Sequence, residues 1–246
     1  GSVGKTTLKN LISFSLKNYG KVCQSPHSYN NKFGVPLSLS NLKSNTEYGI
    51  FEIGMDKKGE IDTLSKIIKP DVGVITNISY AHAKNFRNIK QIALAKSEII
   101  KNIKDDGAIV LNADDQFYNF HKNIALKRKI RIYSFSTKKK KANIKLNSIK
   151  KEGKKYKVFI NEGNQKMYFY TSSNFENDIK NLLAALTVIG IFKSVSKLNK
   201  NIFYNHKKLE GRGDISKIKI NKKNIYLIDE SYNSNPLSLK SAIKNF

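Results

Sequence analysis

The first seven residues have the composition and order of a phosphate-binding loop. They read Gly1-Ser2-Val3-Gly4-Lys5-Thr6-Thr7. Glycines let backbone amides approach a phosphate, the Lys5 ammonium offsets its charge, and the Thr6 hydroxyl can ligate magnesium. A helix that starts at such a loop also points its positive end at the anion. The segment therefore predicts nucleotide binding, and the alternative is a chance glycine turn before a lysine-rich helix.

Other polar side chains follow strand-like segments. Glu52 lies near the end of the apolar segment 48–53, His82 follows the β-prone segment 72–78, and Asp114-Asp115 follows another such segment. In open parallel sheets, ligands gather outside the carboxyl ends of the strands. We therefore expect Glu52 and His82 to converge on the phosphate loop, although a single histidine is more often an ordinary hydrogen-bonding residue.

Lys96 lies on the apolar stripe of its own predicted helix, residues 89–103. Burial lowers the pKa of an ammonium group, and a neutral amine can react with carbon dioxide to form a carbamate, which resembles a carboxylate as a magnesium ligand. Alternatively, the stem packs while the amine reaches water. The spacing alone leaves both interpretations open.

An alternating order of strands and helices positions these residues. Helices are predicted over 5–19, 61–68, 89–103, 116–126 and 178–192, and strands over 48–53, 72–78, 108–112 and 130–135. This order predicts an α/β fold with a mostly parallel sheet flanked by helices. Between residues 142 and 172 the sequence becomes β-rich, with turn signals at Glu152-Gly153 and Glu162-Gly163, so antiparallel hairpins are expected there.

Two domains are predicted. Residues 1–210 would form a nucleotide-binding domain, and residues 211–246 would begin a second domain with a buried strand at 225–228 and a helix opened by Pro236. One strand and one helix cannot close a core, so we expect the rest of that domain to lie outside this sequence. We likewise expect a strand directly before Gly1, and only weak nucleotide binding without ligation from these residues alone.

Composition excludes several classes of protein. The chain has 246 residues, 39% of them hydrophobic, and no apolar run approaches the roughly 20 residues of a membrane span. The single cysteine, Cys23, rules out an internal disulfide framework and fits a reducing cytoplasm. The formal charge of +26 comes from lysines scattered along the chain, which argues against a nucleic-acid patch. The dense run Lys138 to Lys141 is interpreted as a solvated turn.

Several segments together resemble the Mur ligase family in order and spacing. Besides the phosphate loop they are Tyr29-Asn30-Asn31-Lys32-Phe33-Gly34-Val35-Pro36-Leu37, Phe51-Glu52-Ile53-Gly54-Met55, Gly59-Glu60-Ile61, Ile75-Thr76-Asn77-Ile78, Ala81-His82, Ala95-Lys96-Ser97-Glu98-Ile99 and Asp229-Glu230-Ser231-Tyr232-Asn233-Ser234-Asn235-Pro236. The resemblance implies a central ATPase domain between a uridine-nucleotide domain and a Rossmann-like C-terminal domain.

The implied activity is ATP-dependent amide ligation that joins D-alanyl-D-alanine to UDP-N-acetylmuramoyl-tripeptide through an acyl phosphate, in a monomeric cytoplasmic enzyme with no membrane attachment. The Asn-Asn segment and the Tyr-Asn-x-Asn-Pro segment favour this amine. A family member that adds another amino acid remains an alternative, and so does a basic nucleic-acid-binding phosphate-loop NTPase.

The resemblance also implies residue roles at the phosphates. Lys5 and the loop amides would hold the ATP phosphates, Thr6 and Glu52 would ligate one magnesium ion, and His82 with carbamylated Lys96 would ligate a second.

Further residues would contact the other ligand groups. Asn30 and Asn31 would line the muramoyl-peptide site, Asn181 would contact adenine, Arg212 would reach phosphate, and Asn233 and Asn235 would close over the nucleotide. The ordinary alternatives are a helix-surface asparagine, a charged turn residue and turn formers before Pro236. Before Asn181 the family's usual Gly-x-His-Asn segment is replaced by Phe175-Glu176-Asn177-Asp178.

Overall fold

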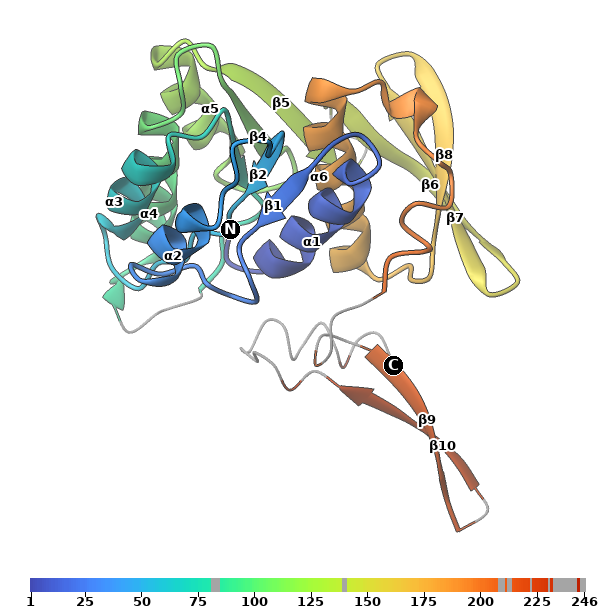
Figure 1. The fold of residues 1–246 in the computed structure, drawn as a ribbon. Coiled ribbons are helices and arrows are strands. Elements are labelled where there is room, and N and C mark those ends of the chain that lie inside the picture. Colours follow the sequence, from blue (N-terminus) through green and yellow to red (C-terminus); the bar gives the residue numbers. More distant parts are fainter. Residues whose placement is uncertain are drawn as a thin grey trace. The chain divides into compact units, whose positions relative to one another are not determined.

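A computed structural model describes residues 1–80, 85–138, 141–207, 211, 214–221, 223–229, 231 and 243 (Figure 1). The chain divides into two compact units, Gly1–Asn205 and His206–Phe246, so the first unit ends five residues before the predicted boundary at 210. The domain assignment itself stays a prediction. The predicted site residues His82, Arg212, Asn233 and Asn235, and the helix expected at Pro236, lie outside the described residues.

The first unit is built around one six-stranded sheet. Its strands, in spatial order, are β3 (Val72–Ile75), β4 (Ala108–Asn112), β5 (Arg131–Ser136), β6 (Ile144–Glu152), β7 (Lys155–Glu162) and β8 (Gln165–Thr171). The pairs from β3 to β6 are parallel, and the pairs β6–β7 and β7–β8 are antiparallel. The predicted parallel sheet and the predicted hairpins are therefore both confirmed, and they belong to one sheet.

Helices cover both faces of the parallel part. They are α1 (Lys5–Leu16), α2 (Gly34–Ser40), α3 (Glu60–Ile68), α4 (Ile89–Lys101), α5 (Tyr118–Lys127) and α6 (Glu176–Phe192). Helices α1 and α6 lie side by side against one face, and α3, α4 and α5 form the other layer (Figure 1). Strand β4 serves both cores: Val110 packs with the α1–α6 layer, while Ile109 and Leu111 pack with the other. All five of its residues are buried, as expected for a central parallel strand.

A short parallel pair, β1 (Val22–Gln24) and β2 (Tyr48–Ile50), lies beside this sheet. A cavity of about 670 Å³ separates β2 from β3 and is lined by residues of both strands, including Ile50 and Val74. Strand β2 ends three residues earlier than predicted, so Glu52 stands two residues beyond it. Neither β1 nor α2 was predicted from the sequence.

The described part of the second unit is one antiparallel hairpin, β9 (Asp214–Ile220) with β10 (Lys223–Asp229). The strand predicted at 225–228 lies within β10, but the prediction that it is buried was wrong, because Ile225 and Leu227 are 42% and 50% exposed. In the part of the chain that the structure describes, β9 and β10 pair only with each other, and a two-stranded hairpin alone forms a single layer. Among the described residues, none of the helices combines the length and apolar character that a membrane span requires.

Candidate functional site

The phosphate loop turns into α1 at a glycine with left-handed backbone geometry. Gly4 has a φ of 83°, and the helix begins at Lys5. A Cβ atom at Gly4 would lie 2.7 Å from Oδ1 of Asn181, so the loop backbone packs directly against α6. The first N–H groups of a helix have no acceptor within it, which leaves the start of α1 suited to bind an anion.

The segment after β3 fixes the beginning of the loop. Oδ1 of Asn77 accepts hydrogen bonds from the backbone N–H groups of Ser2 and Val3, both at 2.9 Å. The Thr76 hydroxyl donates to the carbonyl of Val3 at 2.9 Å. The amides of Ser2 and Val3 are therefore already used inside the protein, and the donors best placed for a phosphate are those at the start of α1.

Glu52 and Thr6 meet at this loop. The Thr6 hydroxyl donates to Oε2 of Glu52 at 2.6 Å, and the Glu52 side chain is 5% exposed. The Asn30 side-chain amide donates to Oε1 at 2.8 Å, and the backbone N–H of Glu52 donates to the Ser25 hydroxyl at 3.2 Å. The carboxylate is thus held from both sides next to the threonine that follows Lys5.

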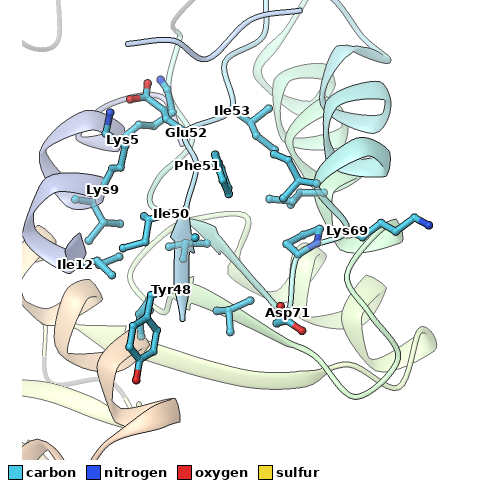
Figure 2. A pocket seen from close by; sticks show the side chains of 18 of the residues that line it. Lys5, Lys9, Ile12, Tyr48, Ile50, Phe51, Glu52, Ile53, Lys69 and Asp71 are labelled. Carbon is cyan, nitrogen blue, oxygen red and sulfur yellow. The ribbon is translucent and has the colours of Figure 1, made fainter. Parts of the chain in front are cut away.

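The cavity between β2 and β3 has apolar walls and charged residues at both ends, and the end at the phosphate loop is its polar end. Lys5 and Glu52 lie together at one end of it, whereas Tyr48 and Asp71 lie at the other (Figure 2). The polar end is also lined by Gly1, Thr76 and Lys96, and the walls behind it by apolar residues of α1, β2, β3 and α6, including Leu8, Ile12, Leu16, Ile50, Val72, Val74, Val188 and Phe192.

Lys96 is buried at the polar end, with 4% of its surface exposed. Burial, and to a lesser extent the neighbouring positive charge of Lys5, lowers the pKa of its ammonium group to about 7. Two residues along α4, the Glu98 carboxylate accepts the backbone N–H groups of Gly59 and Asp62 at 2.8 and 3.1 Å. Helix α4 is thereby tied to the start of α3, which fixes where Lys96 lies.

A second buried lysine, Lys9, was missed by the sequence analysis. It lies one helical turn after Lys5, and its ammonium donates to the carbonyls of Ser25, at 2.6 Å, and His27. It ties the segment before Asn30 to α1. The available signal was its position between the apolar residues of α1, the same signal that singled out Lys96.

The two adjacent asparagines predicted to line the muramoyl-peptide site have different surroundings. Asn30 contacts Glu52, whereas Oδ1 of Asn31 accepts the N–H groups of Phe33 and Gly34 at 3.1 and 2.9 Å and so shapes the turn into α2. Asn181 is buried, at 6% exposure, against the loop glycine. The unusual residues before Asn181 form the first turn of α6, which begins at Glu176.

The structure therefore brings together the loop with Lys5 and Thr6, Glu52, Lys96 and Asn30. His82 lies outside the described residues, although the chain leading to it is fixed by Asp115, whose Oδ2 accepts the N–H of Ile78 at 2.7 Å. Asp115 was noted in the sequence only as a polar residue after a strand.

The oxygen atoms of the Thr6 and Glu52 side chains could ligate magnesium. The hydroxyl of Thr6 and the carboxylate of Glu52 are oxygen ligands of the kind this ion prefers. Within the described part of the chain, no group of three or more histidine, cysteine, aspartate or glutamate side chains could hold a metal. Magnesium commonly uses one or two protein oxygens together with phosphate and water, so such a sparse set is sufficient.

Fold and site together define a phosphate-loop α/β protein whose polar groups lie at the carboxyl end of a parallel sheet. The model of the Mur ligase middle domain matches residues 1–189. The chain therefore belongs to the Mur ligase family.

Its relatives include two proteins named UDP-N-acetylmuramoyl-tripeptide–D-alanyl-D-alanine ligase. Those of Rickettsia prowazekii and Buchnera aphidicola subsp. Baizongia pistaciae are each 32% identical over 99% of this chain, which covers 54% and 52% of their lengths. The chain thus spans about half of each relative.

Solved structures agree with this family and fold. MurF from Acinetobacter baumannii is 26% identical with a TM-score of 0.88, over 99% of this chain and 52% of that one. MurF ligase from Thermotoga maritima, solved in complex with ADP, is 25% identical with a TM-score of 0.85, over 100% of this chain and 55% of that one.

Proposed function

We propose that this chain is the nucleotide-binding part of an ATP-dependent ligase that joins D-alanyl-D-alanine to UDP-N-acetylmuramoyl-tripeptide in peptidoglycan synthesis. The observation that carries the proposal is the meeting of Lys5, Thr6, Glu52 and Lys96 at one end of one cavity. The relatives that match almost the whole chain carry the name of this ligase, which supports the choice of substrates.

The site suits phosphoryl transfer. The substrate's terminal carboxylate attacks the γ-phosphorus of ATP, ADP leaves, and the resulting acyl phosphate is attacked by the amine of D-alanyl-D-alanine, which releases phosphate and one proton. Such a reaction needs charge neutralisation and alignment more than a protein nucleophile. Lys5 and the start of α1 supply positive charge where it builds up on the phosphates.

Thr6 and Glu52 would hold one magnesium ion, and His82 with carbamylated Lys96 a second. When bound, magnesium would neutralise the charge that develops on the transferred phosphoryl group. The protein's own contribution is to keep the Glu52 carboxylate buried, oriented and next to the phosphate loop.

Lys96 would carry a carbamate in the working enzyme. Its pKa of about 7 leaves a large neutral fraction at neutral pH, and only a neutral amine adds carbon dioxide. The modification also replaces a buried positive charge with a negative one beside Lys5. Carbon-13 NMR with labelled carbon dioxide should show one carbamate that is absent from Lys96→Met, with occupancy rising from about pH 6 to about pH 8, on either side of that pKa.

The apolar walls of the cavity, which include Ile50 and Val74, offer no partner for a charged phosphate. Only the end of the cavity with Lys5 and Glu52 is therefore assigned to the phosphates of the nucleotide.

The remaining roles follow the resemblance. Asn30 and Asn31 would line the muramoyl-peptide site, and Asn181 would contact the nucleotide beside Gly4. Arg212, Asn233 and Asn235 would act from the second unit. We further propose a monomer that works in the cytoplasm.

The test is ATP-dependent phosphate release by a full-length protein that contains this chain. Release should require both UDP-N-acetylmuramoyl-tripeptide and D-alanyl-D-alanine and should fall to background with either alone. Release with a single amino acid in place of the dipeptide would instead identify another amino-acid ligase of the family. Stimulation by polynucleotide with a steep salt dependence would support the nucleic-acid-binding alternative.

A further inference from the structure

The Glu52 carboxylate receives one hydrogen bond on each oxygen. Thr6 occupies Oε2 and Asn30 occupies Oε1. We propose that Asn30 is a positioning residue that sets the orientation of the Glu52 carboxylate for magnesium, in addition to any contact with substrate. This inference rests on the proposed function and assigns Asn30 a role before the muramoyl substrate binds.

The rotation of the Glu52 carboxylate is set by its protein contacts. Glu52 is almost fully buried, so protein groups rather than water set the rotation of its carboxylate plane. Hydrogen bonds to an ionised group are among the stronger ones in proteins. With Thr6 and Asn30 on opposite oxygens, rotation would break both bonds at once.

The backbone of Asn30 is itself held in place by neighbouring residues. Its backbone carbonyl accepts the N–H of Gly54 at 2.7 Å. Lys9 fixes the chain just before it through the carbonyls of Ser25 and His27. These contacts fix the backbone from which the Asn30 side chain reaches the Glu52 carboxylate.

Gly54 leaves room for the Asn30 side chain beside Glu52. A Cβ atom at this position would lie 2.7 Å from Oδ1 and 2.9 Å from Cγ of Asn30. The backbone φ of Gly54 is not in the left-handed region, so conformational freedom does not explain the glycine. The missing side chain instead leaves the space that the Asn30 amide occupies beside Glu52.

Two variants separate positioning from substrate contact. Asn30→Ala removes the donor to Glu52, and Gly54→Ala pushes the Asn30 amide away without changing Asn30. The matched control is Asn41→Ala, an exposed asparagine at the end of α2. ADP binding would be measured by calorimetry across a magnesium titration, in the full chain without any muramoyl substrate, and again in EDTA.

We expect both variants to need about tenfold more magnesium for half of its effect on ADP binding, which corresponds to the loss of one charge-assisted hydrogen bond. Affinity in EDTA should stay at the parental value, and the double variant should resemble either single one, because both remove the same contact. Thermal unfolding of each variant would verify that the fold is retained.

Three results would be decisive against the inference. A parental magnesium dependence in both variants, with a higher KM for the muramoyl substrate, would reduce Asn30 to a substrate contact. Equal weakening in EDTA and in magnesium would indicate general damage to the loop. Absence of any magnesium effect in the parent protein would remove the proposed function as well, and so would be distinguishable from the first result.

Discussion

The parallel and antiparallel halves of the main sheet differ in where their lysines lie. In the parallel half, Lys9 and Lys96 are buried: Lys9 binds the carbonyls of Ser25 and His27, and Lys96 lies close to Lys5. In the antiparallel half, Lys155 and Lys157 lie partly exposed over aromatic rings. Both halves draw on the same lysine-rich composition, so the position of a lysine carries functional information that its abundance does not.

In the antiparallel half, contacts within the protein account for the positions of Lys155 and Lys157, so no ligand is needed to explain them. Nζ of Lys155 lies 4.3 Å from the centroid of the Tyr204 ring and donates to Asn201 at 3.0 Å. Nζ of Lys157 lies 4.2 Å from the centroid of the Tyr168 ring. Cations over aromatic faces are stabilised by the ring quadrupole. These contacts account for part of the charge of +26 as surface packing on a hairpin.

The largest effect is expected from Lys96→Met, which removes the buried amine of the parallel half. The folded pKa is about 7 and the unfolded value is about 10.4, so the unfolded chain binds more protons between these values, and stability is lost as the pH falls from about 10 to about 7. In buffer free of carbon dioxide, where the amine is unmodified, removing it should therefore stabilise the chain at neutral pH by on the order of 4 kcal/mol. The same substitution should abolish ligation by the full-length enzyme.

The measurement is the free energy of unfolding at about pH 7 and about pH 9, for both proteins. The parent should gain stability with pH over this interval, and Lys96→Met should show a flatter profile. A variant that is less stable than the parent at both pH values would show that the amine is not the unfavourable buried charge described here.

The next effect concerns nucleotide affinity. Lys5→Met should weaken ADP or ATP binding by about 10- to 100-fold, because it removes a charged partner of the phosphates. Isothermal calorimetry would measure this, and Lys155→Met provides the same substitution in the antiparallel half. Comparable losses from both variants would mean that the binding is a general response to positive charge.

The Glu98 carboxylate has a structural role in the parallel half, because it links α4 to the start of α3. Glu98→Ala should lower the free energy of unfolding by about 1–2 kcal/mol, because it leaves the partly buried N–H groups of Gly59 and Asp62 without their acceptor. Chemical denaturation would measure it. The control is Asp105→Ala, whose side chain is 98% exposed and whose loss should be almost neutral.

Much of the fold could be predicted because its signals are local. The strand Ala108–Asn112 was predicted with its correct bounds, because a continuous run of apolar residues marks it. Helix α4 was predicted to within two residues, because its apolar residues recur at helical spacing. Strand β1 and helix α2 were missed. Each is short, and α2 starts at a turn made by the Asn31 side chain rather than by a strong apolar pattern.

The site was predictable in part for the same reason. The phosphate loop is a contiguous motif, and the strand before Glu52 indicated which edge it would occupy. The bond from Asn30 to Glu52 spans 22 residues, and those from Asn77 to the loop span more than 70. Such contacts depend on how the elements pack, so no local pattern could have assigned Asn30 or Asn77 to the carboxylate and the loop.

The smallest effect is expected from Lys155→Met, which tests whether a lysine of the antiparallel half contributes to stability rather than to nucleotide binding. Lys155→Met should cost about 0.5–1 kcal/mol of stability, since the ring of Tyr204 loses a partly exposed cation and Asn201 loses a hydrogen bond. Nucleotide binding should keep the parental affinity, because the contacts that Lys155 makes are to Tyr170, Tyr204 and Asn201 and to none of the residues that line the polar end of the cavity. Denaturation and calorimetry on the same preparation would measure both quantities. Weakened binding without loss of stability would give the hairpin lysines a part in holding the nucleotide, and the division between the two halves would then have to be abandoned.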